Sequence, residues 1–117
     1  MTYVKISDQL IPASIRGRVS DGDWGGRESK AITCELSHAE AAKLFVDDLA
    51  WSIIYQADSY EDPETGETVT PEAETYDNSA YSVAGPITDH RDGTVTVKMG
   101  KPTAAELLAI LTGGETV

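Results

Sequence analysis

The stretch 30-KAITCELSHAEAAKLFVDDLAWSIIYQA-57 contains the change of hydrophobic period that sets the fold class. Its first seven residues alternate between apolar and polar side chains, which is typical of a strand. Ser37 is followed three places later by Glu40, which is the spacing of a capping box, and apolar residues then recur at helical spacing. We therefore predict a helix over 38–48. The apolar run at 51–57 predicts a strand directly after this helix.

The patterns on either side of this unit predict further strands and one more helix. Thr103 and Glu106 repeat the capping-box spacing, Gly113–Gly114 predicts the end of the second helix, and the last few residues are expected to fray. The further strands are expected at 2–6, 13–20, 80–83 and 94–99, with a glycine-rich turn at 20–27 and a break at Gly85–Pro86. The fold class is therefore α+β: an antiparallel twisted sheet of about five to seven strands with two helices packed on one face.

The length of 117 residues predicts a single domain with one core. Every apolar run is much shorter than the roughly 18 residues that a membrane-spanning helix needs, and the N-terminus has no secretory pattern. We therefore expect no association with a membrane. Cys34 is the single cysteine and cannot form an internal disulfide, which favours a reducing compartment such as the bacterial cytoplasm.

The charge is large and unevenly placed. The formal net charge is −11, and no Lys or Arg occurs between Lys43 and Arg91, a span that holds eleven of the twenty acids. The rest of the chain holds nine acids and nine bases, so the whole excess lies in the middle. Such a chain repels nucleic-acid phosphates and anionic lipid, which excludes nucleic acid as a partner.

The segment 57–78 carries eight of these carboxylates, and we predict that it forms an acidic protruding hairpin or loop. Pro63 and Gly66 are typical turn residues, so 59–61 and 68–70 can pair on either side of a turn. The acids would then remain in water, where they are available to a partner. The candidate contact residues of this segment are Glu61, Asp62, Glu64 and Glu67.

Trp24 is the fifth candidate contact residue. It lies among glycines in the 20–27 turn, where little of the local sequence can bury an indole. Tryptophan is enriched both at interfaces and in cores. Two interpretations therefore stay open: Trp24 marks a contact surface, or its ring folds back over the edge of the sheet.

Motifs for catalysis, metals and cofactors are weak, so we predict no catalytic residue, metal or cofactor. Asp21, Asp23 and Gly26 begin like an EF-hand loop, but Ile32 stands where the bidentate Glu is required. His38 and His90 are the only histidines, and with Cys34 they do not supply a zinc site at recurrent spacing. We expect Cys34 to be a buried, inert thiol and both histidines to be solvated. No P-loop, G-x-S-x-G or G-x-G-x-x-G motif is present.

Three long stretches carry a resemblance: IPASIRGRVSDGDWGGRESKAIT, AWSIIYQAD and YDNSAYSVAGPITDHRDGTVTVKMGKPT. The chain resembles a group of small proteins without assigned function that are encoded in phages and prophages of gut Firmicutes, usually near tail genes. The resemblance implies a viral or prophage origin and a role in the virion or in tail assembly. It implies no active-site residue.

These observations lead to three hypotheses. The first is a non-enzymatic phage or prophage structural or protein-interaction protein of the cytoplasm or virion, whose partners are other virion components or a second copy paired through an exposed strand such as 94–99. The alternative is an acidic inhibitor or nucleic-acid mimic that binds a basic host protein. The third, ranked lowest, is a small hydrolase whose carboxylates, or Cys34 and a histidine, would converge in a cleft.

Overall fold

A computed structural model of the protein describes residues 1–111. The expected helix stop at Gly113–Gly114 and the fraying of the last residues therefore lie outside the described part of the chain. The elements are β1 (Thr2–Ile6), β2 (Gln9–Asp21), η1 (Gly22–Trp24), β3 (Arg27–Cys34), α1 (His38–Leu44), β4 (Trp51–Tyr55), β5 (Tyr60–Glu61), β6 (Thr68–Val69), β7 (Glu74–Asp77), β8 (Val83–Asp89), β9 (Val95–Gly100) and α2 (Ala104–Leu111).

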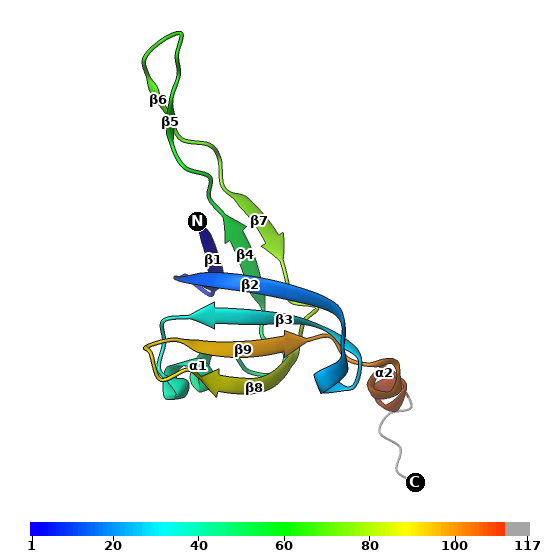
Figure 1. Cartoon of the computed structure of the whole chain (residues 1–117). Helices are drawn as coiled ribbons and strands as arrows, with labels where there is room; N and C mark the ends of the chain where they lie inside the picture. The colour runs from blue at the N-terminus through cyan, green and yellow to red at the C-terminus, as the bar shows by residue number, and fades with distance from the viewer. Residues whose placement is uncertain (112–117) are drawn as a thin grey trace.

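Seven strands form one sheet in the order β7-β4-β1-β2-β3-β9-β8, and every pair is antiparallel. The chain is mainly antiparallel sheet with two short helices, so the predicted α+β class holds only in this coarse form, and the main sheet has seven strands, within the five to seven expected. β2 changes partner along its length: residues 9–12 pair with β1, and residues 13–21 pair with β3. The sheet therefore bends at β2, so that β1, β4 and β7 run steeply across the direction of β3, β8 and β9 (Figure 1).

The core lies on the inner side of this bent sheet and is closed by α1. Alternation along the strands brings Val4, Ile32, Ile53 and Val97 to one side, where each is at most 1% exposed. Helix α1 adds Ala41 to the same cluster and contacts β8 and β9, and its C-cap residue Phe45 joins the cluster too. The capping box predicted at the start of α1 is present, with Ser37 and Glu40 bonded to each other's backbone N–H.

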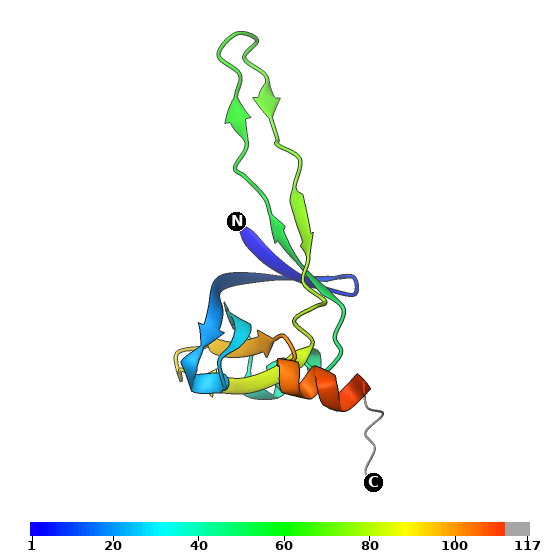
Figure 2. The same ribbon diagram turned by 90° about the vertical axis from the view of Figure 1, so that its right-hand side faces the viewer.

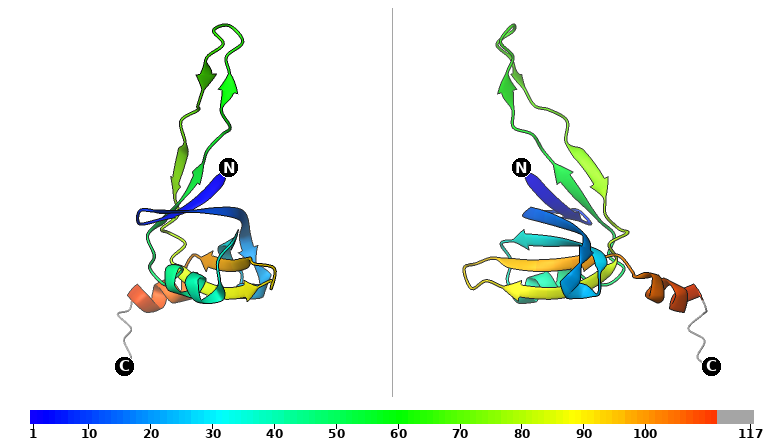
Figure 3. Two further views of the ribbon diagram at one scale, coloured as in Figure 1. Left: turned by 90° about the vertical axis from the view of Figure 1, so that its left-hand side faces the viewer. Right: turned by 45° about the vertical axis from the view of Figure 1, so that its right-hand side comes forward.

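The second helix does not pack as the sequence predicts. We expected two helices on one face of the sheet, and this is wrong for α2. All side chains from Ala104 to Leu108 are exposed, and Leu107 and Leu108 are 47% and 62% exposed. The helix projects from the body beyond β9 (Figures 1 and 3). α1 already covers the inner side of β8 and β9, and Leu107 and Leu108 of α2 lie outside the core cluster.

α2 is joined to the body by polar contacts instead. The Arg27 guanidinium donates two hydrogen bonds to the Glu106 carboxylate, at 2.7 and 3.1 Å, and a third to the Lys101 carbonyl at 3.1 Å. Thr103 and Glu106 form the second predicted capping box. The sequence pattern therefore locates the start of the helix correctly but does not reveal its unpacked position.

Two strand expectations are also corrected. The strand expected at 94–99 is not an edge: β9 lies between β3 and β8, so it cannot pair with another copy through a free edge. The strand expected at 80–83 begins only at Val83, and residues 80–82 connect β7 to it. The Gly85–Pro86 pair does not break this strand, because it forms a bulge inside β8. The edges of the sheet are β7 and β8.

Candidate interaction surface

Residues 56–73, here named the acidic arm, leave the end of β4 and return to β7 (Figures 1 and 2). Strands β5 and β6 pair antiparallel, Tyr60 with Val69 and Glu61 with Thr68, which confirms the predicted hairpin. The protrusion is shorter than the expected 57–78, because residues 74–77 belong to the main sheet as β7. The molecule measures 70 × 33 × 27 Å, and the arm points along its long axis.

The base of the arm is tied to the N-terminus of the chain. The Gln56 N–H donates to the Met1 carbonyl at 2.9 Å, and the Met1 ammonium donates to the Gln56 carbonyl at 2.6 Å. The Gln56 side-chain amide donates to the Pro71 carbonyl at 2.8 Å and so bridges the two legs of the arm. Three hydrogen bonds therefore join the base of the arm to the N-terminus and link its two legs, which continue the paired strands β4 and β7.

The tip of the arm is ordered by its own hydrogen bonds. The Gly66 N–H donates to the Asp62 carbonyl and the Asp62 N–H to the Glu67 carbonyl, both at 2.8 Å. The Asp62 carboxylate accepts the Glu64 N–H at 2.8 Å, so this acid stabilises the turn. Gly66 has φ 73°, a conformation in which glycine carries no steric cost. The carboxylates of Glu61, Glu64 and Glu67 remain exposed around this turn.

The carboxylates of the arm form no ion pair with any of the residues 1–111. Five ion pairs join described residues, and none of them includes a residue of the arm. The Met1 ammonium lies at the base of the arm, on the Gln56 carbonyl, so the field of the unpaired carboxylates toward the tip extends into solvent over roughly a Debye length, about 8 Å at physiological salt.

Trp24 does not join this surface. Its ring is half-buried on the outer side of β8 and β9, beside the Arg27 guanidinium, which lies 4.6 Å from the ring centroid. A Cβ at Gly85 would come within 2.5 Å of the Trp24 ring, and a Cβ at Gly100 within 2.8 Å. The indole therefore folds back over the sheet, the second of the two interpretations, at the end of the body away from the arm tip, where η1 lies (Figure 1).

Two exposed tyrosines at the base of the arm were not foreseen from the sequence. Tyr55 and Tyr76 are 43% and 50% exposed, and their rings meet edge to face with centroids 5.6 Å apart. Tyr55 follows Ile53 on the core side of β4, and Tyr76 pairs with Ile53, so both rings extend the inner face of the sheet beyond the body. The alternation of apolar residues along β4 places Tyr55 on the same side as Ile53. It does not show that the core ends before Tyr55, so it could not predict that this ring is exposed.

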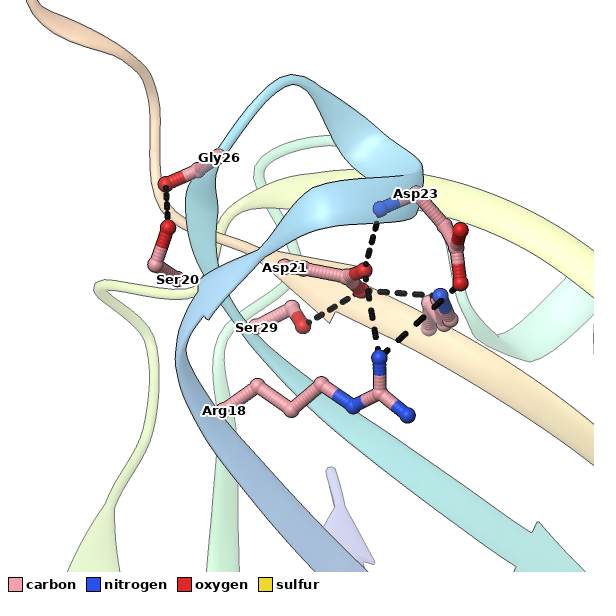
Figure 4. Close-up of polar contacts among 7 residues, drawn as sticks. Arg18, Ser20, Asp21, Asp23, Gly26 and Ser29 are labelled. Atoms are coloured by element: carbon pink, nitrogen blue, oxygen red, sulfur yellow. Dashed lines mark hydrogen bonds and ion pairs between the residues drawn. The ribbon is translucent and has the colours of Figure 1, made fainter.

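The EF-hand-like turn is held by the buried carboxylate of Asp21 (Figure 4). Asp21 is 0% exposed, and its carboxylate accepts hydrogen bonds from the Lys98 ammonium at 2.8 Å, the Ser29 hydroxyl at 3.0 Å and the Asp23 N–H at 3.0 Å. The Lys98 hydrogen bond, opposed by burial, lowers the pKa of Asp21 below its usual range. The ammonium of Lys98 thus supplies the positive charge that a calcium ion would supply in an EF-hand.

The remaining motif residues lie apart. Cys34 is buried, and burial raises the pKa of its thiol. His38 is exposed at the start of α1, and His90 bonds the Thr96 hydroxyl through Nε2 at 2.7 Å. Over residues 1–111 the Cys34 thiol has no hydrogen bond to a histidine, and no group of three or more His, Cys, Asp or Glu side chains is placed to hold a metal ion.

Comparison with known proteins adds no family to this description. No protein-family model, no curated protein sequence and no solved structure matches the chain. No helix in the described part of the chain is long and apolar enough to cross a membrane. The geometry of the arm and of the surfaces around it therefore carries the functional argument.

Proposed function

We propose that the protein is a non-enzymatic structural or protein-interaction component of a phage or prophage, associated with the tail or its assembly, and that the acidic arm is its contact element. One observation carries the interaction role: residues 56–73 extend the molecule to 70 Å without contributing to the buried core. A segment of this kind adds little stability, since its acids lie in water and bury no apolar surface. Because the arm contributes little to the stability of the fold, we assign it a role in binding another macromolecule.

The chemistry of the arm suits a protein partner with basic residues. Glu61, Glu64 and Glu67 present carboxylates on an internally bonded turn, and an ordered turn loses little conformational entropy on binding. Tyr55 and Tyr76 add exposed aromatic surface where the arm leaves the body. Tyrosine is enriched among the residues that dominate interface energies. Together these residues form a surface with an aromatic base and an acidic outer part.

The experiment tests whether the protein enters particles and whether entry needs the arm. A lysogen that carries the gene is induced, particles are purified, and the protein is quantified by mass spectrometry. The test variant replaces residues 58–70 with an Asn-Gly turn, which preserves the Gln56 and Pro71 contacts at the base of the arm. We expect wild-type protein in the particles and a loss of at least roughly tenfold for the shortened protein, as for loss of a main contact element.

A matched pair of variants separates charge from length. Glu61→Gln/Glu64→Gln/Glu67→Gln removes three charges from the arm, and Asp8→Asn/Glu35→Gln/Asp48→Asn removes three exposed charges elsewhere. We expect the first variant to lower incorporation and the second to leave it unchanged. Normal incorporation of the shortened protein would show that the arm is not the contact element. Absence of the wild-type protein from particles, with normal particle yield when the gene is deleted, would overturn the structural role.

The alternative of an acidic inhibitor that binds a basic host protein differs in its dependence on salt. A binding energy supplied mainly by exposed carboxylates falls steeply as ionic strength rises. A mimic also needs acids arrayed over a broad face, whereas these acids lie on a narrow two-stranded ribbon. The structural role is therefore the better supported of the two.

A further inference from the structure

The outer side of the sheet contains a groove that is free of carboxylates, although the chain carries twenty of them. The groove has a volume of about 390 Å³ and runs over β2, β3 and β9. None of its seven lining residues is acidic. Its polar lining residues are Ser14, Arg16, Thr33, His90 and Thr96.

The groove is built from one row of alternating residues on each strand. Ser14 pairs with Thr33, and Thr33 with Thr96, so three hydroxyl side chains lie in line across β2, β3 and β9. The Thr33 and Thr96 hydroxyls bond each other at 2.8 Å, and His90 bonds the Thr96 hydroxyl at 2.7 Å. In the next row Arg16 pairs with Ala31, whose small side chain leaves room beside the guanidinium.

The groove thus combines hydroxyl groups, an imidazole and a guanidinium. Arg16 is exposed and forms no ion pair with any described residue. A guanidinium presents five N–H donors in a planar fork that matches a carboxylate. Hydroxyl and imidazole groups can donate further hydrogen bonds to the same anion. The chemistry of the groove therefore fits a segment that carries several carboxylates.

We propose that this groove receives the tip of the acidic arm of a second copy of the chain. The inference rests on the proposed function, because it uses the arm as the contact element, and it names both the partner and the receiving site. The arm of the same molecule is directed away from the body in every view, and none of its acids pairs with a described cation (Figures 1, 2 and 3).

Local charge complementarity favours a second copy as the occupant: the arm carries six acids and no Lys or Arg, whereas the groove is lined by Arg16 and by no carboxylate. Outside the arm the chain carries fourteen acids and nine Lys or Arg, so the body is itself net negative and the attraction is confined to the groove. Repulsion between the two arms is screened beyond roughly 8 Å at physiological salt, whereas pairs in contact are screened much less. Because the molecule is 70 Å long and only 33 Å and 27 Å wide, an arm can extend past its own body to reach a neighbour.

Arm and groove are different surfaces, so the contact is heterologous: each copy donates one arm and receives one. Such contacts generate rings when the rotation closes and chains when it does not. Self-association of this kind needs no free strand edge, which agrees with the central position of β9 in the sheet.

The test is sedimentation equilibrium of the purified full chain at about 0.15 M and about 0.5 M salt, because the lower value already screens the repulsion between the arms. We expect an average mass well above the 12.5 kDa of one chain at the lower salt, and a mass approaching it at the higher salt. Arg16→Glu and Glu61→Lys/Glu64→Lys should each raise the dissociation constant at least roughly tenfold, since each places like charges together. Lys43→Glu is the matched control, because Lys43 is exposed on α1 and forms no ion pair with a described residue.

Two combinations make the assignment specific. A chain carrying both Arg16→Glu and Glu61→Lys/Glu64→Lys should self-associate again, because the charges are exchanged between the two surfaces. A mixture of the groove variant with the arm variant should form complexes through the pairing of unchanged arms with unchanged grooves. Thermal unfolding of every variant checks that the fold is retained.

Three results would overturn the proposal: one-chain mass under all conditions, association that resists high salt, or equal effects of Arg16→Glu and Lys43→Glu. None of them bears on incorporation into particles, which is measured separately with the arm variants. Loss of incorporation without self-association would identify the arm's partner as another protein. Self-association without any effect of the arm variants on particles would instead leave the arm–groove contact standing and remove the proposed function.

Discussion

The position of the Trp24 ring requires glycine, which has no side chain, at two distant positions of the sequence. Gly85 and Gly100 lie under the indole, on adjacent strands, and a Cβ at either would fall within 3 Å of the ring. The sequence displays the glycines beside Trp24, but the two that matter are more than sixty residues away along the chain. No local pattern could connect them, because the contact is created by the pairing of β8 with β9 and by the turn that brings η1 over them.

The first prediction concerns this contact. Gly85→Ala should destabilise the protein by about 1–3 kcal/mol, the usual cost of adding a methyl group to a filled site. The methyl group must displace the ring of Trp24, since it would otherwise lie 2.5 Å from Cη2. The change in free energy of unfolding is measured by urea denaturation.

A double-mutant cycle supplies the control for this prediction. In a Trp24→Ala background the added methyl group has space, so Gly85→Ala should cost much less than it does in the wild type. Equal costs in the two backgrounds would show that the ring does not lie over Gly85. Gly93→Ala is not a suitable comparison, because Gly93 has φ 92° and is strained by any side chain.

Glu106 provides a prediction at the same scale. Its hydrogen bond from Arg27, with support from the Thr103 backbone, lowers its pKa from 4.5 to about 2. A carboxyl with a depressed folded-state pKa stabilises the folded form above its unfolded pKa, and this stabilisation is lost as pH falls through the folded value. The attachment of α2 should therefore weaken between pH 4.5 and about 2.

Amide hydrogen exchange at Leu107, whose N–H bonds the Thr103 carbonyl, is the readout for α2. We expect its protection to fall over this pH range in the wild type, and to be low and independent of pH in Glu106→Gln. Val97, buried in the core, reports whether the whole fold opens instead. If both amides lose protection together, the ion pair does not control α2 separately.

At the scale of elements, the acidic arm and β7 differ although they are continuous in sequence. The arm contains one pair of two-residue strands, whereas β7 pairs with β4 along four residues. The composition of 57–78 is uniformly acidic, so charge predicted one protruding segment. The boundary at Glu74 arises from the pairing of Ile53 with Tyr76, which is a long-range contact that composition does not reveal.

A pair of deletions tests this boundary. Replacing 58–70 with an Asn-Gly turn should change the melting temperature by no more than a few degrees, because it removes no residue of the core. Replacing 58–77 removes β7 as well and exposes one edge of β4. We expect this longer deletion to lower the melting temperature by roughly 10 °C or more, which calorimetry measures. Equal melting temperatures would show that β7 contributes nothing to the sheet.

Other elements were located from sequence where the signal is local. Both capping boxes, the strand at 2–6 and the hairpin of the arm appear as predicted. The predicted packing of α2 on the sheet was wrong. An apolar stripe shows that a helix has a side that could be buried, but it does not show that the rest of the protein packs against that side. The groove containing Arg16 was not foreseen either, since its lining residues come from three strands and a turn.

At the scale of the whole molecule, the arm dominates the shape. The radius of gyration is 17.7 Å, whereas a compact chain of this length has roughly 13 Å. Small-angle X-ray scattering of the monomeric protein at high salt should therefore give a value near 17.7 Å. Replacing 58–70 should lower it by about 2–4 Å toward the compact value. A wild-type value near that of a compact chain would show that the arm lies against the body in solution.

The pairing of β2 with both β1 and β3 affects how the protein unfolds. Because one continuous strand is shared by both halves of the bent sheet, neither half can open without disturbing the other. The pairing of β1 with β4 also requires closing a loop of some fifty residues of intervening chain. Folding and unfolding should therefore be concerted across the body and slow for a chain of this size, with no long-lived state in which one half alone is formed.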